Sequence, residues 1–423
     1  MINLLRNLFN RYCSILGIKD VVLLVYSNVF NNTVYDVTQF VSFILGFDTM
    51  RIFGVALVYV FYASSTIMRF FSGAVIDVLG HEKKVLAISD ALMSVSYVIA
   101  FLIIVMMGIN SLSLILMLIT IMLGMSIYSA MGVIRSALIK DLLYNDNEKI
   151  TLYTSLNNTL RSLISITAIV ISGYLLYLNI DTAKYLILTS ALLSMVALIP
   201  LTLMRHHGRV TDRPSTQVLR QGFVKFSELV KNNISFRVLI LIMVITYLLI
   251  ISLDVLNYSI LSIYYNIALL AGIDRVFGTI GVVIGSMLAP RFRVNKLGTI
   301  IVLMVIALIV GLGFCIVPMT IRIMIIAVPT LFILNFIYNI PINAFFTAMG
   351  SMLIYVTPRR EFGIVYSSMW TILTVSQILS SIIWAFIGTV VGAPEALLIA
   401  MLTGIVIFLI IKYSLGKVSY PAF

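Results

Sequence analysis

Twelve continuous apolar stretches run along this sequence, and no other feature limits its fold so strongly. A helix needs about 20 apolar residues to cross the hydrocarbon core of a bilayer, whereas membrane strands alternate polar and apolar residues. Because the stretches do not alternate, they predict an all-α integral membrane protein with twelve transmembrane helices. The predicted ranges are 20–46, 52–79, 85–107, 112–138, 152–178, 183–204, 237–264, 268–290, 298–317, 323–355, 363–390 and 394–413.

Composition argues against a soluble protein, a nucleic-acid-binding protein or an enzyme. Of the 423 residues, 61% are hydrophobic and 10% are charged, whereas a soluble domain is about half apolar and a quarter charged. The net charge of +12 comes from basic residues scattered between the apolar stretches, so we expect no nucleic-acid partner. Cys13 and Cys315 lack a disulfide or metal-site spacing, and no phosphate-binding loop or catalytic motif stands out. We therefore expect no cofactor, no bound metal and no enzyme activity.

The distribution of Lys and Arg predicts the orientation in the membrane. If the N-terminus is cytoplasmic, 21 of the 28 basic residues lie in cytoplasmic segments and three, Arg51, Lys184 and Arg322, lie in outside loops. The positive-inside rule then places both termini in the cytoplasm of a multi-pass protein of the cell membrane. The predicted domains are a cytoplasmic segment 1–19, a helical bundle 20–204, a cytoplasmic linker 205–236, a second bundle 237–413 and a cytoplasmic tail 414–423.

The two halves of the sequence resemble each other. Three residues of the segment that leads into the fifth predicted helix recur 213 positions later in the segment that leads into the eleventh: Glu148, Tyr153 and Ser155 match Glu361, Tyr366 and Ser368. Gly73 and Gly285, near the ends of the second and eighth helices, are 212 positions apart. The constant offset indicates two six-helix repeats in parallel orientation, which is an architecture of transporters.

A loop between the second and third predicted helices carries a family resemblance. Its sequence is Gly73-Ala-Val-Ile-Asp77-Val-Leu-Gly80-His81-Glu82-Lys83-Lys84. The loop resembles the signature loop of the major facilitator superfamily at Gly73, Asp77, Gly80, Lys83 and Lys84. It departs from that pattern at Val78, where a basic residue is usual, and at Glu82. The resemblance implies the major facilitator fold, with two pseudo-symmetric six-helix halves and transport by alternating access.

The resemblance also implies a gating role for this loop. Asp77 at a helix end can accept hydrogen bonds from the N-terminus of a neighbouring helix, and the resemblance suggests helix 11, entered through 357–361. Such a latch would favour the outward-open state, whereas the alternative is a basic loop that only sets topology. Arg135, near the cytoplasmic end of the fourth helix, is expected to be structural or gating.

Polar residues line one face of several predicted spans, where a charge costs about 2.5–3.5 kcal/mol at mid-bilayer. In the first helix Asn28, Asn32 and Asp36 recur every four residues, with Asn31, Tyr35 and Gln39 beside them. The resemblance makes helices 1, 4, 7 and 10 the walls of the transport cavity, and these stripes agree with it. The other candidate solute- or proton-binding residues are Arg161, Asp254, Asn257, Tyr258, Asn335, Tyr338, Asn339 and Asn343.

The role of each polar group stays open between function and structure. A buried carboxylate can bind and release a proton because desolvation penalises its charged form, so Asp36 and Asp254 are candidates for proton or cationic-substrate binding. The alternative is a permanent ion pair, for example Asp36 with Arg69 or Arg161. Arg161 therefore has two possible roles, binding an anion or forming a structural ion pair. The adjacent Asp274 and Arg275 suggest a local or interhelical pair. Asn335, Asn339 and Asn343 either line the cavity or join helices by hydrogen bonds.

Two further patterns bear on the direction of transport. The residues Ser27-Asn28 with Tyr35-Asp36, and Ala87-Ile88-Ser89-Asp90, resemble a drug-efflux branch of the superfamily found in bacteria and archaea. The Gly- and Pro-rich antiporter motif of helix 5 is absent, and 161–173 stands in its place, so this motif gives no support to proton antiport.

We expect a secondary transporter that exports a small organic, amphipathic or cationic solute in a proton-linked cycle. Metabolite uptake by symport or facilitated diffusion is the alternative, and a non-transporting membrane sensor is the alternative from another class. The expected partners are the small-molecule substrate, protons as coupling ion and membrane lipid, with the protein as a monomer.

Overall fold

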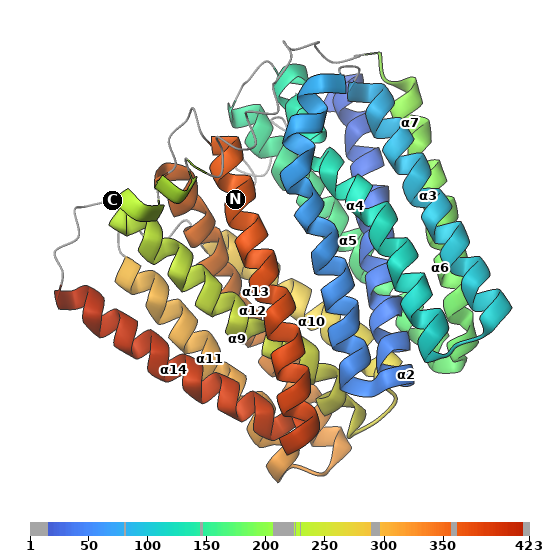
Figure 1. Ribbon diagram of the computed structural model, residues 1–423. Coiled ribbons are helices and arrows are strands. Elements are labelled where there is room, and N and C mark those ends of the chain that lie inside the picture. The colour runs from blue at the N-terminus through green and yellow to red at the C-terminus, as the bar shows by residue number, and fades with distance from the viewer. Residues whose placement is uncertain are drawn as a thin grey trace, which may run out of the picture. The chain divides into compact units, whose positions relative to one another are not determined.

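A computed structural model describes residues 16–79, 82–143, 147–205, 224, 226–228, 230–288, 297–356 and 362–417 (Figure 1). The elements assigned within these residues are helices, as the sequence predicts. They are α2 (Lys19–Leu79), α3 (Glu82–Met107), α4 (Ser111–Leu142), α5 (Asn147–Leu178), a 3₁₀ turn (Ile180–Thr182), α6 (Ala183–Val196), α7 (Leu198–Leu203), α9 (Ile234–Ser262), α10 (Ile267–Leu288), α11 (Leu297–Thr320), α12 (Met324–Val356), α13 (Phe362–Val391) and α14 (Ala393–Lys417).

Helix α2 is two membrane helices joined by a tight reversal. Its 61 residues would extend about 90 Å as one helix, three times the thickness of a hydrocarbon core. Arg51 breaks the helix with φ 53° and ψ −136°. The rings of Phe43 and Tyr59 then lie 4.6 Å apart between centroids, whereas 16 residues of continuous helix would separate them by about 24 Å. The chain therefore turns back at Arg51.

Two glycines permit this reversal because they let the helical segments on either side of Arg51 touch through their backbones. A Cβ atom added to Gly54 would lie 1.8 Å from the carbonyl oxygen of Gly46, and one added to Gly46 would lie 2.7 Å from that of Gly54. Neither approach is possible for a side-chain carbon.

We expect Gly54→Ala to lower the free energy of unfolding by about 1–3 kcal/mol or more, because the added methyl group meets backbone that must move. Thermal unfolding of the purified protein in detergent measures the effect. Gly298→Ala is the matched control, since nothing lies within 4 Å of a Cβ atom there. Equal melting temperatures for the two variants would contradict the proposed backbone contact.

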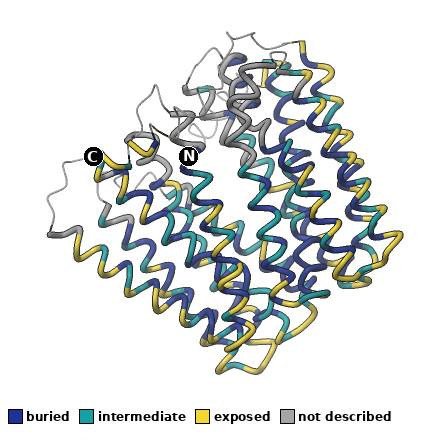
Figure 2. The backbone as a smooth tube through the Cα atoms, in the orientation of Figure 1, coloured by how far each residue is buried: buried dark blue, intermediate teal, exposed yellow. Residues whose placement is uncertain are grey.

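The number of spanning helices agrees with the prediction. By length and composition, 11 of the described helices can cross a membrane when α2 counts once, and dividing α2 at Arg51 gives twelve. Large apolar side chains are exposed on these helices, and Figure 2 shows exposed residues recurring along α14, where Leu402, Val406 and Leu409 are examples. Such exposure suits contact with lipid.

The chain divides into two compact units, which are described separately. The first comprises Met1–Ser42, Ser64–Ser172 and Ile180–Leu219, and the second comprises Phe43–Ala63, Gly173–Asn179 and Arg220–Phe423. In the first, α3 packs against α4, α6 and α7, and in the second α12 packs against α10 and α11, α14 against α11, and α13 against α9. A buried cluster joins α2, α3, α4, α5 and α7 of the first unit: Val21, Leu24, Leu86, Leu138, Leu142, Tyr153 and Leu201.

In the second unit, α10 and α12 approach each other closely through a row of glycines. A Cβ atom on Gly281 would lie 2.4 Å from the carbonyl oxygen of Phe336, and one on Gly285 would lie 2.3 Å from that of Ile340. Small residues at this spacing let helix backbones meet in a membrane. Helix α12 runs from Met324 to Val356 and contains Pro329 and Pro341.

Candidate functional site

The polar stripe of α2 faces a matching stripe on α5 in the first unit. The amide of Asn28 donates a hydrogen bond to the hydroxyl of Tyr153 (2.5 Å), and Asp36 pairs with Arg161. Both pairs are separated by 125 residues, so the two helices run parallel and in register. Tyr153, Arg161 and Ser165 recur at multiples of four residues, which puts them on one face of α5.

The carboxylate of Asp36 is fully paired. Its Oδ1 accepts from Nη2 of Arg161 (2.9 Å), and its Oδ2 accepts from Nε of Arg161 (3.2 Å) and from the hydroxyl of Ser165 (2.7 Å). This two-point contact is the strong geometry for a guanidinium and a carboxylate. The side chains of Arg161 and Asp36 are 37% and 16% exposed, so the pair is partly accessible. Of the two arginines that the sequence offered as partners, the structure pairs Asp36 with Arg161.

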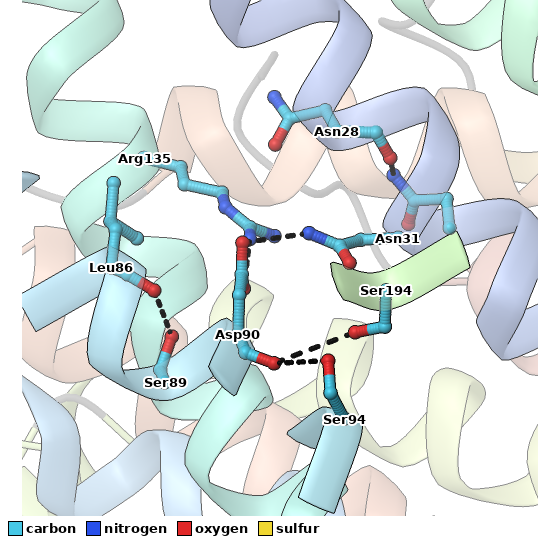
Figure 3. A network of polar contacts seen from close by, with 9 residues as sticks. Asn28, Asn31, Leu86, Ser89, Asp90, Ser94, Arg135 and Ser194 are labelled. Carbon is cyan, nitrogen blue, oxygen red and sulfur yellow. Dashed lines mark hydrogen bonds and ion pairs between the residues drawn. The ribbon is translucent and has the colours of Figure 1, made fainter. Parts of the chain in front are cut away.

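A second, fully buried network surrounds Asp90 of α3 (Figure 3). Its Oδ1 accepts from Nη2 of Arg135 (2.8 Å), and its Oδ2 accepts from the amide of Asn31 (2.8 Å). The guanidinium of Arg135 also lies over the ring of Tyr128, 4.3 Å from its centroid. The Asp90 side chain has no exposure and that of Arg135 has 9%, which makes this network a structural link between α2, α3 and α4.

In the second unit, polar groups of α9, α10 and α12 meet. The amide of Asn257 donates to Oδ2 of Asp274 (2.9 Å), and the amide of Asn335 donates to the backbone oxygen of Asp274 (2.9 Å). Asp254 lies near the hydroxyl of Tyr59 and is attracted by Arg275. Asp274 is thus held from both neighbouring helices.

The asparagines of α12 bond mainly along their own helix. Asn339 donates to the side-chain oxygen (2.7 Å) and backbone oxygen (2.9 Å) of Asn335, and Asn343 donates to the backbone oxygen of Asn339 (3.1 Å). A Cβ atom on Gly278 of α10 would lie 3.0 Å from the amide nitrogen of Asn335, so this glycine leaves room for the stripe. The interhelical hydrogen bond of Asn335 fits the alternative in which these residues join helices, whereas a cavity-lining role stays a prediction.

The other candidates occupy varied settings. Asn32 donates to the backbone oxygen of Asn28 (2.7 Å), while Tyr35 and Gln39 are half-buried on α2. The ring of Tyr258 lies 5.4 Å from that of Phe43, and the ring of Tyr338 lies 6.2 Å from that of Phe314. These contacts place the residues without assigning them a role.

Most of the predicted latch lies outside the described part of the structure. Gly80 and 357–361 are outside the described residues, and the same holds for the side-chain environment of Gly73 and Asp77. Lys83 is described, and its ammonium group donates to the backbone oxygens of Thr202 (3.1 Å) and Met204 at the end of α7. A cation at the C-terminus of a helix binds the last backbone oxygens, which have no partner within the helix, and interacts favourably with the helix dipole. Lys84 is exposed.

Sequence reasoning missed the partners of several candidates. Tyr153 and Ser165 could have been found from their four-residue spacing with Arg161 on α5. The pairing of Asp90 with Arg135 has no comparable signal, because the two residues lie 45 positions apart on different helices. The proximity of Tyr59 to Asp254 depends on the reversal at Arg51, so the sequence gives no local signal for it either.

Comparison with known proteins supports the family suggested by the signature loop. The solved structure of the nucleoside transporter NupG matches with a TM-score of 0.71 at 13% identity, covering 95% of this chain and 100% of that one. A POT family transporter in complex with 5-aminolevulinic acid matches with a TM-score of 0.73 at 11% identity, covering 95% and 96%. A comparison with curated protein sequences found no match.

At this level of identity the structural matches show the fold alone. The sequence itself matches the family model of the Major Facilitator Superfamily over residues 23–343, which is more than half of the chain. The protein therefore belongs to the Major Facilitator Superfamily.

Proposed function

We propose that the protein is a secondary transporter that exports a small zwitterionic or charged organic solute by alternating access in a proton-linked cycle. The observation that carries the proposal is the partly exposed ion pair of Asp36 and Arg161 within the polar stripes of α2 and α5. The family and its transporter neighbours favour transport over catalysis.

The ion pair supplies both charges that a zwitterion needs. A solute carboxylate can accept from the guanidinium of Arg161, and a solute ammonium group can donate to Asp36. Each contact replaces one that the pair makes with itself, so binding leaves no charge unpaired, which would be costly in a low-dielectric site. A fully buried pair such as Asp90 with Arg135 could not exchange partners in this way, because its side chains are out of reach.

Export is proposed from the resemblance of the first and third helices to the drug-efflux branch. Uptake of a metabolite is the second candidate. The names of the neighbours bear on the class of solute and not on the direction of transport: they are a nucleoside transporter and a POT family transporter holding 5-aminolevulinic acid or a conjugated peptide. 5-Aminolevulinic acid carries an amine and a carboxyl group, which matches the chemistry of the Asp36–Arg161 pair.

We further propose that the protein works as a monomer in the cell membrane with both termini in the cytoplasm. The segment 205–236 links two six-helix bundles. The loop with Gly73, Asp77 and Gly80 acts as the cytoplasmic latch, and the polar residues of α2, α9 and α12 line the path of the solute.

Exchange of labelled solutes in proteoliposomes tests the function. The panel is 5-aminolevulinic acid, a dipeptide, a nucleoside and a lipophilic cation, each measured with and without an imposed pH gradient. We expect exchange of the zwitterions, and net export that increases when the gradient drives protons inward. Transport of the lipophilic cation alone would contradict the proposed solute class, and export that ignores the gradient would contradict the proton link.

A further inference from the structure

The membrane aspartates differ in how completely they are paired. Both oxygens of Asp36 and both oxygens of Asp90 accept hydrogen bonds. Asp274 accepts through Oδ2 alone, and its Oδ1 is buried with no hydrogen-bond partner among the described residues. The residue is 5% exposed, so it has little contact with solvent. An unpaired oxygen of a buried carboxylate is unfavourable when the group is charged, which makes Asp274 the least satisfied of these three.

The charges around Asp274 leave one negative charge in excess. The groups that face it are Asp254 and Tyr258 from α9 and Arg275 from its own helix. Helix α12, which packs against α10, contributes only the amide of Asn335 and has no charged residue between Met324 and Val356. Two carboxylates and one guanidinium therefore share this part of the unit, and a single added positive charge balances them.

The surroundings favour a proton over a metal ion as that charge. The amide of Asn257 donates an N–H to the carboxylate of Asp274, whereas hard cations require several oxygen ligands. Within the described residues no group of three His, Cys, Asp or Glu side chains could hold a metal ion. The donor at Oδ2 favours the ionised carboxylate and the unpaired Oδ1 disfavours it, so the two effects oppose each other at Asp274.

We propose that Asp274 binds the coupling proton of the transport cycle and that Asn257 changes its hydrogen bond with each protonation step. In the ionised state the Asn257 amide donates to Oδ2, as observed. When a proton from water forms an O–H bond at Oδ2, the amide rotates by half a turn and its Oδ1 accepts from that O–H. The Oδ1 of Asn257 suits this role because it too is buried without a partner in the described structure. This inference rests on the proposed proton link and assigns it to Asp274 in place of Asp36.

Infrared difference spectroscopy of the reconstituted full-length protein tests the assignment without requiring a substrate. The C=O stretch of a protonated carboxyl group is compared between acidic and alkaline pH for wild type, Asp274→Asn and Asp36→Asn. We expect a buried carboxyl band that titrates in wild type and in Asp36→Asn and is lost in Asp274→Asn. In Asp274→Glu, which retains a titratable group if Asp274→Asn folds poorly, the band should persist at a shifted frequency.

The same proteins are then assayed for gradient-driven export and for exchange of 5-aminolevulinic acid. We expect Asp274→Asn to lose the response to the pH gradient while exchange continues. If Asp274→Asn keeps both the band and the gradient response, the inference is wrong and the proposed proton link stands. If wild-type export ignores the gradient, the proton link fails, and the inference fails with it.

Discussion

Replacing Arg135 with methionine should lower the free energy of unfolding by about 3–5 kcal/mol, the cost of leaving a buried charge without its partner. The stranded group is the carboxylate of Asp90, which has no exposure and accepts from Arg135 at 2.8 Å. The amide of Asn31 remains as a donor, but one neutral hydrogen bond does not replace a guanidinium. Thermal and denaturant unfolding of the purified protein measure the change.

Two companion variants separate the ion pair from other effects of the substitution. Lys84→Met removes a charge from an exposed side chain and should leave stability within about 0.5 kcal/mol of wild type. The double variant Arg135→Met/Asp90→Asn removes both charges and should recover most of the loss, because replacing both partners of a buried pair is often nearly neutral. Equal destabilisation by the double variant and Arg135→Met would contradict the assignment of the cost to a stranded charge.

Neutralising the pair of Asp36 and Arg161 should separate stability from transport. Asp36→Asn and Arg161→Gln each strand a partly exposed charge, so each should destabilise less than Arg135→Met, because solvent screens the remaining partner. The double variant should regain stability, since neither charge is left alone.

Transport should not recover with stability. Solute exchange in proteoliposomes should fall by about tenfold or more in both single variants and in the double variant, because a hydrogen bond to a charged group contributes about 1.5–3 kcal/mol. A double variant that is stable and exchanges solute at the wild-type rate would mean that the pair only joins α2 to α5.

The membrane makes the helices of this protein easy to predict. A spanning segment must satisfy its own backbone and remain apolar over its full length, so each helix is visible as a run of residues. The reversal at Arg51 follows from the same pattern, because α2 is too long for a single crossing. Glycines at positions 46 and 54 give the local reason that the turn can be so tight.

The partners of the polar residues were harder to predict. Four-residue spacing shows that Asn28, Asn32 and Asp36 share a face, but it does not show which helix that face meets. In the structure the stripe is divided, because Asp36 bonds to α5 while Asn31 bonds to Asp90 on α3. Likewise, the adjacent Asp274 and Arg275 suggested a local or interhelical pair, but the sequence did not identify Asn257 of α9 as the side chain that bonds to Asp274. These pairings depend on how neighbouring helices are aligned, and the residue spacing within one helix does not show that alignment.

Ligand-induced stabilisation tests whether the Asp36–Arg161 pair binds the transported solute. Thermal unfolding of wild type and of Asp36→Asn/Arg161→Gln is measured with increasing 5-aminolevulinic acid and with each other solute of the panel. At about 100 times its Kd, a bound solute adds about 2.7 kcal/mol of stability. We predict this gain for a zwitterion in wild type and its loss in the double variant. Equal stabilisation of both proteins would mean that the solute binds elsewhere and would contradict binding by the Asp36–Arg161 pair.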